Sequence, residues 1–342
     1  MLTVEIINKI MKDAIGIKSG DIVLLQFWGD DSDRDLLHEF SNVVASLGGS
    51  PIELQHSKET YVKLFNNMEP GCFNESFFKI FDPVDIVIDI CMYQPVTPSS
   101  DFPKEHMNMY RVYMRTLFQT LVQKKKLIQL RVPTKENAAE SGLSYEIYKE
   151  SMLKAYDIDY TRLQNTCTDL VHRISSKNNI KIKTDQDFVL NLSIKNRPWN
   201  MDAGDGDLPC GEVYIAPIEE DTNGKIYFAF LAFEDSETDE KRVADNIIIT
   251  VENGRMISSS SDEFNKFLEN LPQGGNVICE FGIGLNPGVN KLLGYDLLDE
   301  KMIGTFHIAV GNNTMFGGSN DAPLHKDFVG FGTVFMDDEQ IL

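Results

Sequence analysis

The chain has 342 residues, and its 32 Lys and Arg against 52 Asp and Glu give a formal net charge of −20 at pH 7. A surface this acidic repels the phosphates of nucleic acids and of anionic membranes, so we expect neither as a partner. Hydrophobic residues make up 42% of the chain and aromatic residues 10%, which is enough for a packed core, and the length favours two domains.

The first part of the chain, residues 1–133, reads as alternating helices and strands. An amphipathic helix is expected over 4–15, followed by a turn over 17–21 and an apolar strand over 22–27. Further helices are expected over 34–47 and 105–123, and further strands over 51–54, 85–91 and 126–132. Strands joined by helical crossovers predict a doubly wound, mostly parallel sheet with helices on both faces.

Residues 145–177 read as helical, and we interpret them as a bridge to a different kind of domain. The following segments are short and β-rich, with one clear helix over 261–271. The strands are expected over 180–183, 187–194, 213–217, 226–233, 247–251, 277–281, 305–310 and 329–336. The fold prediction is therefore α/β, with an α/β domain over 1–180 and a β-rich α+β domain over 181–342 that carries the metal site discussed below.

Two features indicate the compartment. Residues 1–16 have no apolar signal-peptide core, and no apolar run approaches the roughly 18–20 residues of a membrane span. The cysteines are odd in number, scattered and never arranged as C-x-x-C, which argues against disulfides and a thiolate zinc site. We therefore expect a cytoplasmic protein. The cysteines are Cys72, Cys91, Cys167, Cys210 and Cys279.

The common nucleotide motifs are missing: there is no G-x-x-x-x-G-K-[ST], and the Gly282-x-Gly284 pair lacks the third glycine of a dinucleotide fingerprint. The Asp/Gly stretch 202–207 does not have the spacing of a calcium loop, and it reads as a polar loop.

Two histidines and three carboxylates in the second half of the chain lie in or at the ends of strands near Gly or Pro. His325 and Asp327 are two residues apart, so on an extended segment they project to the same face. Glu280 and Glu212 each stand where a glycine turn meets an apolar strand, and His307 lies inside an apolar strand. Taken one by one, the histidines also fit the role of hydrogen-bonded core residues, and the acids fit the role of capping residues. Together they are the ligand types of divalent metals.

The strings that hold these residues are 208–217, 280–287, 299–311 and 325–327, and in this order they resemble the motifs of the aminopeptidase T / aminopeptidase S family of metallopeptidases. The resemblance implies a homodimeric two-domain α/β enzyme that removes N-terminal residues from short peptides. It also implies one or two divalent ions, such as zinc, cobalt or manganese. The implied metal ligands are Glu212, Glu280, His307, His325 and Asp327.

In this interpretation Glu280 bridges two metal ions, and Glu300 moves the proton of an activated water. The ordinary alternative for Glu300 is a salt bridge with Lys301.

The chain also departs from the family. The peptidases have a tyrosine ligand seven residues after the position of His307, where this chain has Thr314, and the chain is shorter. A neighbouring branch, the 2,5-dihydroxypyridine dioxygenases, holds one iron(II) through two histidines and one carboxylate, so ring-cleaving oxygenation is the alternative function. A third alternative is a non-catalytic scaffold with a degenerate metal site.

Overall fold

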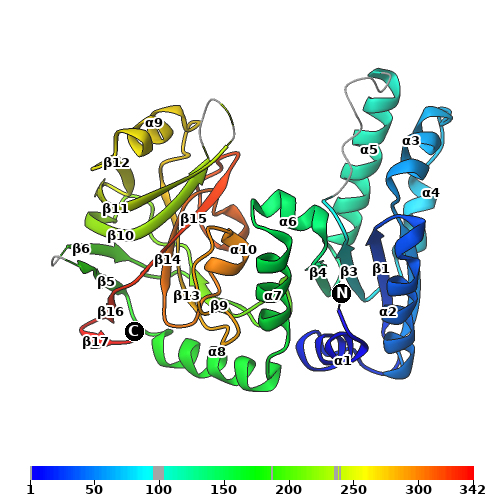
Figure 1. Ribbon diagram of the computed structural model, residues 1–342, viewed down its shortest axis with the longest axis horizontal. Coiled ribbons are helices and arrows are strands. Elements are labelled where there is room, and N and C mark those ends of the chain that lie inside the picture. Colours follow the sequence, from blue (N-terminus) through cyan, green and yellow to red (C-terminus); the bar gives the residue numbers. More distant parts are fainter. Residues whose placement is uncertain (1, 95–103, 186–187, 235–237, 239) are drawn as a thin grey trace. The chain divides into compact units, whose positions relative to one another are not determined.

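The structure is a computed structural model that describes residues 2–94, 104–185, 188–234, 238 and 240–342. The chain forms two compact units, one of residues Met1–Tyr160 with Gly204–Pro209, the other of Thr161–Ala203 with Cys210–Leu342. This division after Tyr160 lies earlier in the chain than the boundary that we expect near residue 180. Figure 1 shows the helices and strands of both units.

The first unit contains a parallel sheet with strand order β2-β1-β3-β4-β8. Its strands are β1 (Ile22–Trp28), β2 (Ser50–Gln55), β3 (Ile86–Cys91), β4 (Lys126–Arg131) and β8 (Asp207–Leu208). Its helices are α1 (Val4–Lys9), α2 (Arg34–Ser46), α3 (Lys58–Asn66), α4 (Glu75–Phe78), α5 (Lys104–Leu121), α6 (Lys135–Ser141) and α7 (Tyr145–Tyr156). Helix α1 continues as a π-helical turn over Ile10–Ala14, and short 3-10 turns span Asp31–Asp33 and Lys79–Phe81.

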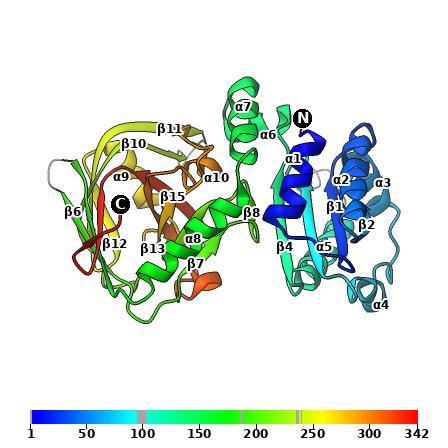
Figure 2. The same ribbon diagram turned by 90° about the horizontal axis from the view of Figure 1, so that it is seen from below.

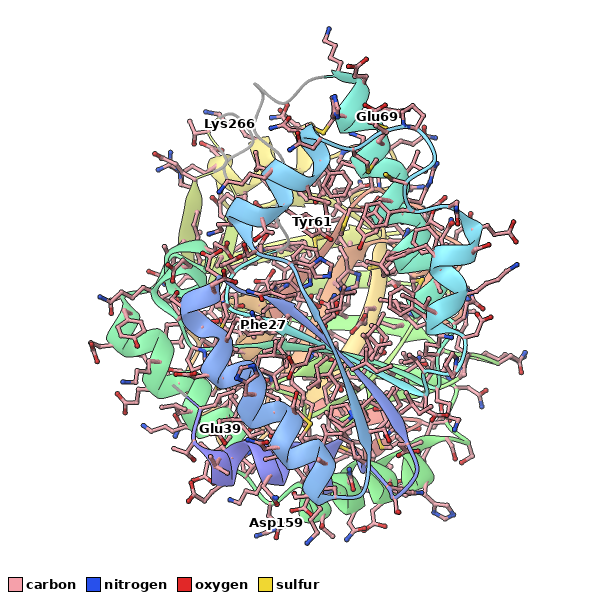
Figure 3. All side chains as sticks on the ribbon, turned by 90° about the vertical axis from the view of Figure 1, so that its right-hand side faces the viewer. Phe27, Glu39, Tyr61, Glu69, Asp159 and Lys266 are labelled. Atoms are coloured by element: carbon pink, nitrogen blue, oxygen red, sulfur yellow. The ribbon has the colours of Figure 1, made fainter. Side chains whose placement is uncertain are left out.

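Helices pack on both faces of this sheet, as the sequence predicts. Leu24 of β1 and Val87 of β3 belong to one core with aromatic residues of α3, α4 and α5. Neighbouring residues of a strand point to the opposite face, where α2 packs against β1 and β2. Figure 3 looks onto this unit, with Phe27 of β1 and Tyr61 of α3 labelled. The short helix α3, which the sequence analysis does not identify, begins where the Ser57 side chain accepts a hydrogen bond from the Thr60 backbone N–H.

A buried histidine lies just after β2 in this unit. The ring of His56 is fully buried and stacks on Trp28 with the ring centres 4.1 Å apart. Its Nδ1 shares a hydrogen bond with the hydroxyl of Tyr61. Burial lowers the pKa of His56 to about 3, so the imidazole is neutral.

The second unit contains two antiparallel sheets and helices α8 (Tyr160–Ile174), α9 (Asp262–Asn270) and α10 (Asp296–Asp299). The seven-stranded sheet has the order β12-β11-β10-β6-β5-β16-β17, and the five-stranded sheet has the order β15-β14-β13-β9-β7. In Figure 2 the long strands β10 and β11 curve side by side across this unit. The strands of the first sheet are β5 (Asn179–Lys183), β6 (Val189–Ser193), β10 (Asn223–Glu234), β11 (Lys241–Glu252), β12 (Arg255–Ser259), β16 (Thr333–Met336) and β17 (Glu339–Gln340). Those of the second are β7 (Asn200–Asp202), β9 (Glu212–Ile215), β13 (Ile278–Gly284), β14 (Phe306–Gly311) and β15 (His325–Gly330).

The unit is rich in β-strands, as the sequence predicts, but one of the predicted strands is wrong. Segment 329–336 is not one strand, because β15 ends at Gly330 and β16 begins at Thr333 in the other sheet. The start of the strand expected over 187–194 lies outside the described residues, and β6 begins at Val189. The helical stretch 145–177 is confirmed as two helices, α7 and α8. In the described part of the chain no helix is long and apolar enough to cross a membrane.

The five-stranded sheet has one face in the core of the unit. Phe306 of β14 and Phe328 of β15 pack toward Phe228 of β10, and Phe328 also contacts Phe264 of α9. Successive residues of a strand point to opposite faces, so His307, next to Phe306, and Asp327, next to Phe328, point to the other face. Packing of the phenylalanine rings therefore determines which side chains of β14 and β15 gather on the opposite side.

Candidate metal centre

The strand register brings all five predicted ligands to one face of the five-stranded sheet. Residues directly opposite each other in an antiparallel pair lie on the same face, as do residues two apart along a strand. These two rules connect Glu212 on β9, Glu280 on β13, His307 on β14, and His325 and Asp327 on β15. The opposed pairs are Glu212 with Gly284, Gly282 with His307, Ala309 with Glu280 and Asp327, and Gly311 with His325. The side chains thus converge from four neighbouring strands.

Small residues between the ligands leave room for them on this face. A Cβ atom on Gly282 would lie 2.0 Å from Nε2 of His307. The imidazole therefore lies directly over the glycine, in space that any other side chain would fill. Gly284 and Gly311 lie on the same face and are restricted by the backbone, since a Cβ atom would lie 2.1 Å from the carbonyl oxygen of Met302 or of Leu324.

Glu280 lies at the centre of the cluster. Its Oε1 is 3.2 Å from Nε2 of His307, and its Oε2 is 3.5 Å from Nε2 of His325. Nε2 of His307 is also 3.3 Å from Oε2 of Glu212, and Nε2 of His325 is 3.5 Å from Oδ2 of Asp327. The five residues therefore form two groups that share Glu280, and in each group the potential ligand atoms lie within 4.8 Å of one another.

His325 is oriented by a hydrogen bond on the side of its ring that faces away from the carboxylates. Its Nδ1 lies 3.0 Å from the carbonyl oxygen of Asn312, so Nδ1 carries the proton and donates it. In a neutral ring this leaves the lone pair on Nε2, which faces Glu280 and Asp327. Metal-binding histidines are usually held in this way. The His325 side chain is 34% exposed whereas Glu280 and Asp327 are each 7% exposed, so the cluster opens to solvent beside His325.

The loop that supplies the Asn312 carbonyl is itself fixed. Oε1 of Glu219 accepts hydrogen bonds from Nδ2 of Asn313 at 3.1 Å and from the backbone N–H of Ser319 at 2.7 Å. Arg197 donates to Oε2 of Glu219 at 2.5 Å and to the carbonyl of Gly317. The loop therefore holds His325 from a position outside the cluster.

Thr314 lies in this loop and takes no part in the cluster. Its side chain is exposed, and its hydroxyl donates to Oδ1 of Asn312 at 2.8 Å. Two aromatic residues lie nearby instead: the ring of Phe316 is 6.0 Å from that of His325 and 5.5 Å from that of Tyr214. Tyr214 points to the ligand face, because it lies two residues after Glu212 on β9.

A buried lysine, which the sequence analysis considers only as a partner of Glu300, also belongs to the cluster. Nζ of Lys301 is 2.6 Å from Oε1 of Glu212, 2.5 Å from Oε1 of Glu300 and 3.6 Å from Oδ2 of Asp202. The salt bridge between Glu300 and Lys301 is thus present. Asp202 joins the cluster through this contact and through its position opposite Glu212 in the register of β7 and β9.

The burial of so many charged groups shifts their pKa values. Burial raises the pKa of Glu212 to about 8 against the opposing effect of Lys301, and burial together with the charge of Glu300 raises that of Asp327 to about 7. Burial alone would lower the pKa of His307, but the hydrogen bond with Glu280 and the charge of Glu212 raise it to about 9. Protons held by the acids and imidazoles therefore offset part of the negative charge of the cluster. A divalent ion that binds to such groups displaces these protons.

The residues fit a divalent metal centre. Within the described ranges, the buried Oε2 of Glu212 and Oδ1 of Asp327 accept no hydrogen bond, although buried oxygens normally have partners. The donor set of three carboxylates and two imidazoles suits zinc, manganese or cobalt. Unpartnered buried carboxylate oxygens in a cluster with two imidazoles are what a cation would coordinate, so the five predicted residues are good candidates for its ligands.

Comparison with known proteins identifies the family of the chain. The family model described as thermophilic metalloprotease (M29) matches residues 43–328, so the chain belongs to this family, whose members are metallopeptidases that use divalent metals. A search of curated proteins gave no match.

Two solved structures have a similar fold. The 2,5-dihydroxypyridine dioxygenase of Pseudomonas putida KT2440 aligns with a TM-score of 0.64 and 12% identity, over 99% of this chain and 94% of its own. AmpT of Thermus thermophilus aligns with a TM-score of 0.63 and 14% identity, over 97% of this chain and 94% of its own. The mixed α/β fold and the predicted resemblance to the aminopeptidase T type are thus confirmed.

Proposed function

We propose that this chain is a metal-dependent hydrolase of the aminopeptidase type, which removes N-terminal residues from short peptides. The observation that carries the proposal is the position of Glu280, with one oxygen toward His307 and the other toward His325. A carboxylate in this position suits two ions about 4 Å apart. Membership in the thermophilic metalloprotease family supports a hydrolytic, metal-dependent enzyme.

In this proposal Glu212, Glu280 and His307 would hold one ion, and Glu280, His325 and Asp327 would hold the other. Bound divalent ions supply an acidified water and polarise the scissile carbonyl. The remaining steps belong to the protein. The open side of the cluster beside His325 admits the substrate.

Glu300 is the proposed proton carrier. Its side chain is 15% exposed and interacts with His307 and Asp327, so it can exchange a proton with a group bound beside these residues. Burial raises the pKa of Glu300, but the charges of Lys301 and His307 outweigh it and lower the pKa overall, so the carboxylate starts ionised and can accept a proton.

Metal analysis and a peptide panel test the proposal. The purified protein should retain one or two divalent ions per chain and release N-terminal amino acids from short peptides when zinc, cobalt or manganese is added. Glu280→Gln should remove both properties. If the protein instead consumes oxygen with iron(II) and 2,5-dihydroxypyridine, the oxygenase alternative holds. If it retains no metal and its melting temperature does not respond to zinc, manganese or iron(II), it is a scaffold.

The expected homodimer and the cytoplasmic location stay predictions. Light scattering on the eluting peak of a size-exclusion column measures the first, and fractionation of the source cells measures the second.

A further inference from the structure

A lysine side chain lies in the interior of the acidic cluster. Lys301 follows α10 and is 2% exposed, which makes it one of the largest fully buried side chains of the described part of the chain. Burying an ammonium group is costly unless charged partners surround it. Here the partners are Glu212, Glu300 and Asp202, at the distances given above.

The surroundings of this ammonium resemble those of a metal ion. Carboxylate oxygens approach Nζ from three separate elements: β7, β9 and the end of α10. Divalent ions bind carboxylates in such an arrangement, with metal to oxygen distances of about 2.0–2.2 Å instead of 2.5–2.6 Å for two of the contacts with Nζ. The lysine thus occupies a place that would otherwise suit a cation.

The same contact determines what Glu212 can offer. Nζ of Lys301 pairs with Oε1 of Glu212, so only Oε2 of Glu212 faces His307. Oε2 is also the oxygen that accepts no hydrogen bond from the described residues. Glu212 is therefore presented as a ligand through one oxygen, with the other held in the protein.

We propose that Lys301 is a built-in counter-cation that limits the cluster to two metal ions and fixes Glu212 as a one-oxygen ligand. The inference rests on the proposed metal centre. The carboxylates of the cluster carry a formal charge of −5, Lys301 contributes +1, and two divalent ions contribute +4, which sums to zero. A third ion would leave a buried excess of positive charge. The carboxylates counted are Asp202, Glu212, Glu280, Glu300 and Asp327.

Counting bound ions tests the proposal. The full chain and its variants are stripped with a chelator, loaded with Mn²⁺, freed of unbound metal and analysed by inductively coupled plasma mass spectrometry. Lys301→Ala opens the space of the ammonium, so it should bind one more Mn²⁺ per chain than the wild type. Lys301→Met removes the charge but fills the space, so it should keep the wild-type number and melt at a lower temperature without metal.

Lys326→Ala is the matched control. Lys326 is also buried and paired with two carboxylates, Glu234 and Asp296, but its side chain points to the opposite face of β15 from His325 and Asp327. This variant should bind the wild-type number of ions.

Each outcome decides the proposal. An equal ion count in Lys301→Ala and the wild type overturns it. If Lys301→Ala folds only when Mn²⁺ is present, the ion replaces the ammonium and the proposal is supported; if it folds in neither condition, the proposal is wrong. A wild type without metal refutes the proposed metal centre and, with it, the limit of two ions, whereas an equal count above zero in both proteins overturns only the role of the lysine.

Discussion

Replacing Gly282 by alanine gives a direct test of the site geometry. The added Cβ would lie 2.0 Å from Nε2 and 2.2 Å from Cε1 of His307. Restoring an ordinary contact of 3.4 Å requires the ring to move by 3.4 − 2.0, or about 1.4 Å. Strand β13 lies between β9 and β14 in the sheet, so its backbone cannot retreat.

The displacement should affect stability and metal binding separately. Overpacking of this kind costs about 1–3 kcal/mol. Each kcal/mol lowers the melting temperature by about 2–4 °C in a unit of this size. Moving a ligand by more than 1 Å should also weaken metal binding. The loss of affinity should be at least as large as the roughly 10- to 100-fold loss seen when a ligand loses its supporting hydrogen bond. Melting in chelator measures the first effect, and zinc competition against a fluorescent chelator measures the second.

Gly330→Ala is the control for this experiment. Its Cβ would lie 2.5 Å from the ring of Phe306, on the core face of the same sheet. It should lower the melting temperature by a similar amount while its zinc affinity stays near that of the wild type. If Gly282→Ala binds zinc as the wild type does, or loses no more affinity than Gly330→Ala, the imidazole does not lie over Gly282 and our account of the site fails.

Three further predictions concern the two ligand groups, the loop that holds His325, and the buried His56. Asp327→Asn should lose one bound ion and Glu280→Ala both, because only Glu280 belongs to both groups; equal losses by metal analysis would contradict the shared carboxylate. Arg197→Met should release the loop that holds His325 and weaken zinc binding roughly tenfold by chelator competition; unchanged affinity would show that the loop is held without it. His56 should lower the stability of the first unit as the pH falls from 6.5 toward 3, because the unfolded chain takes up a proton that the folded His56, with a pKa of about 3, does not. Asp89, whose pKa burial raises to about 7, acts in the opposite direction, so the effect of His56 is measured as the difference between the wild type and His56→Phe, whose melting temperatures should diverge by the equivalent of roughly 3–5 kcal/mol between these pH values.

The strands that carry the ligands could be predicted because their sequence patterns are local. His325 and Asp327 are two residues apart, and Glu280 and His307 lie within apolar runs next to glycines, so strand assignment and sidedness follow from short stretches of sequence. The parallel sheet of the first unit follows in the same way from apolar runs that alternate with helical periodicity.

The contacts between distant strands could not be predicted. That Gly282 lies under His307, or that Asp202 pairs with Glu212, depends on the register between strands far apart in sequence. The position of Lys301 in the acidic cluster depends on the path of the chain after α10. The break at Phe331 and Gly332 was missed because apolar residues continue through it, while the strands on either side join different sheets.

Strand β15 lies at the edge of its sheet and supplies two of the five predicted ligands. Among the described strands it pairs with β14 alone, so its outer edge has no strand partner and it can detach without breaking any pairing inside the sheet. A metal ion bound to His325, Asp327 and Glu280 would join this edge strand to β13, two strands away, as a cross-link does. Metal binding should therefore slow amide hydrogen exchange in β15 far more than in β9, β13 and β14.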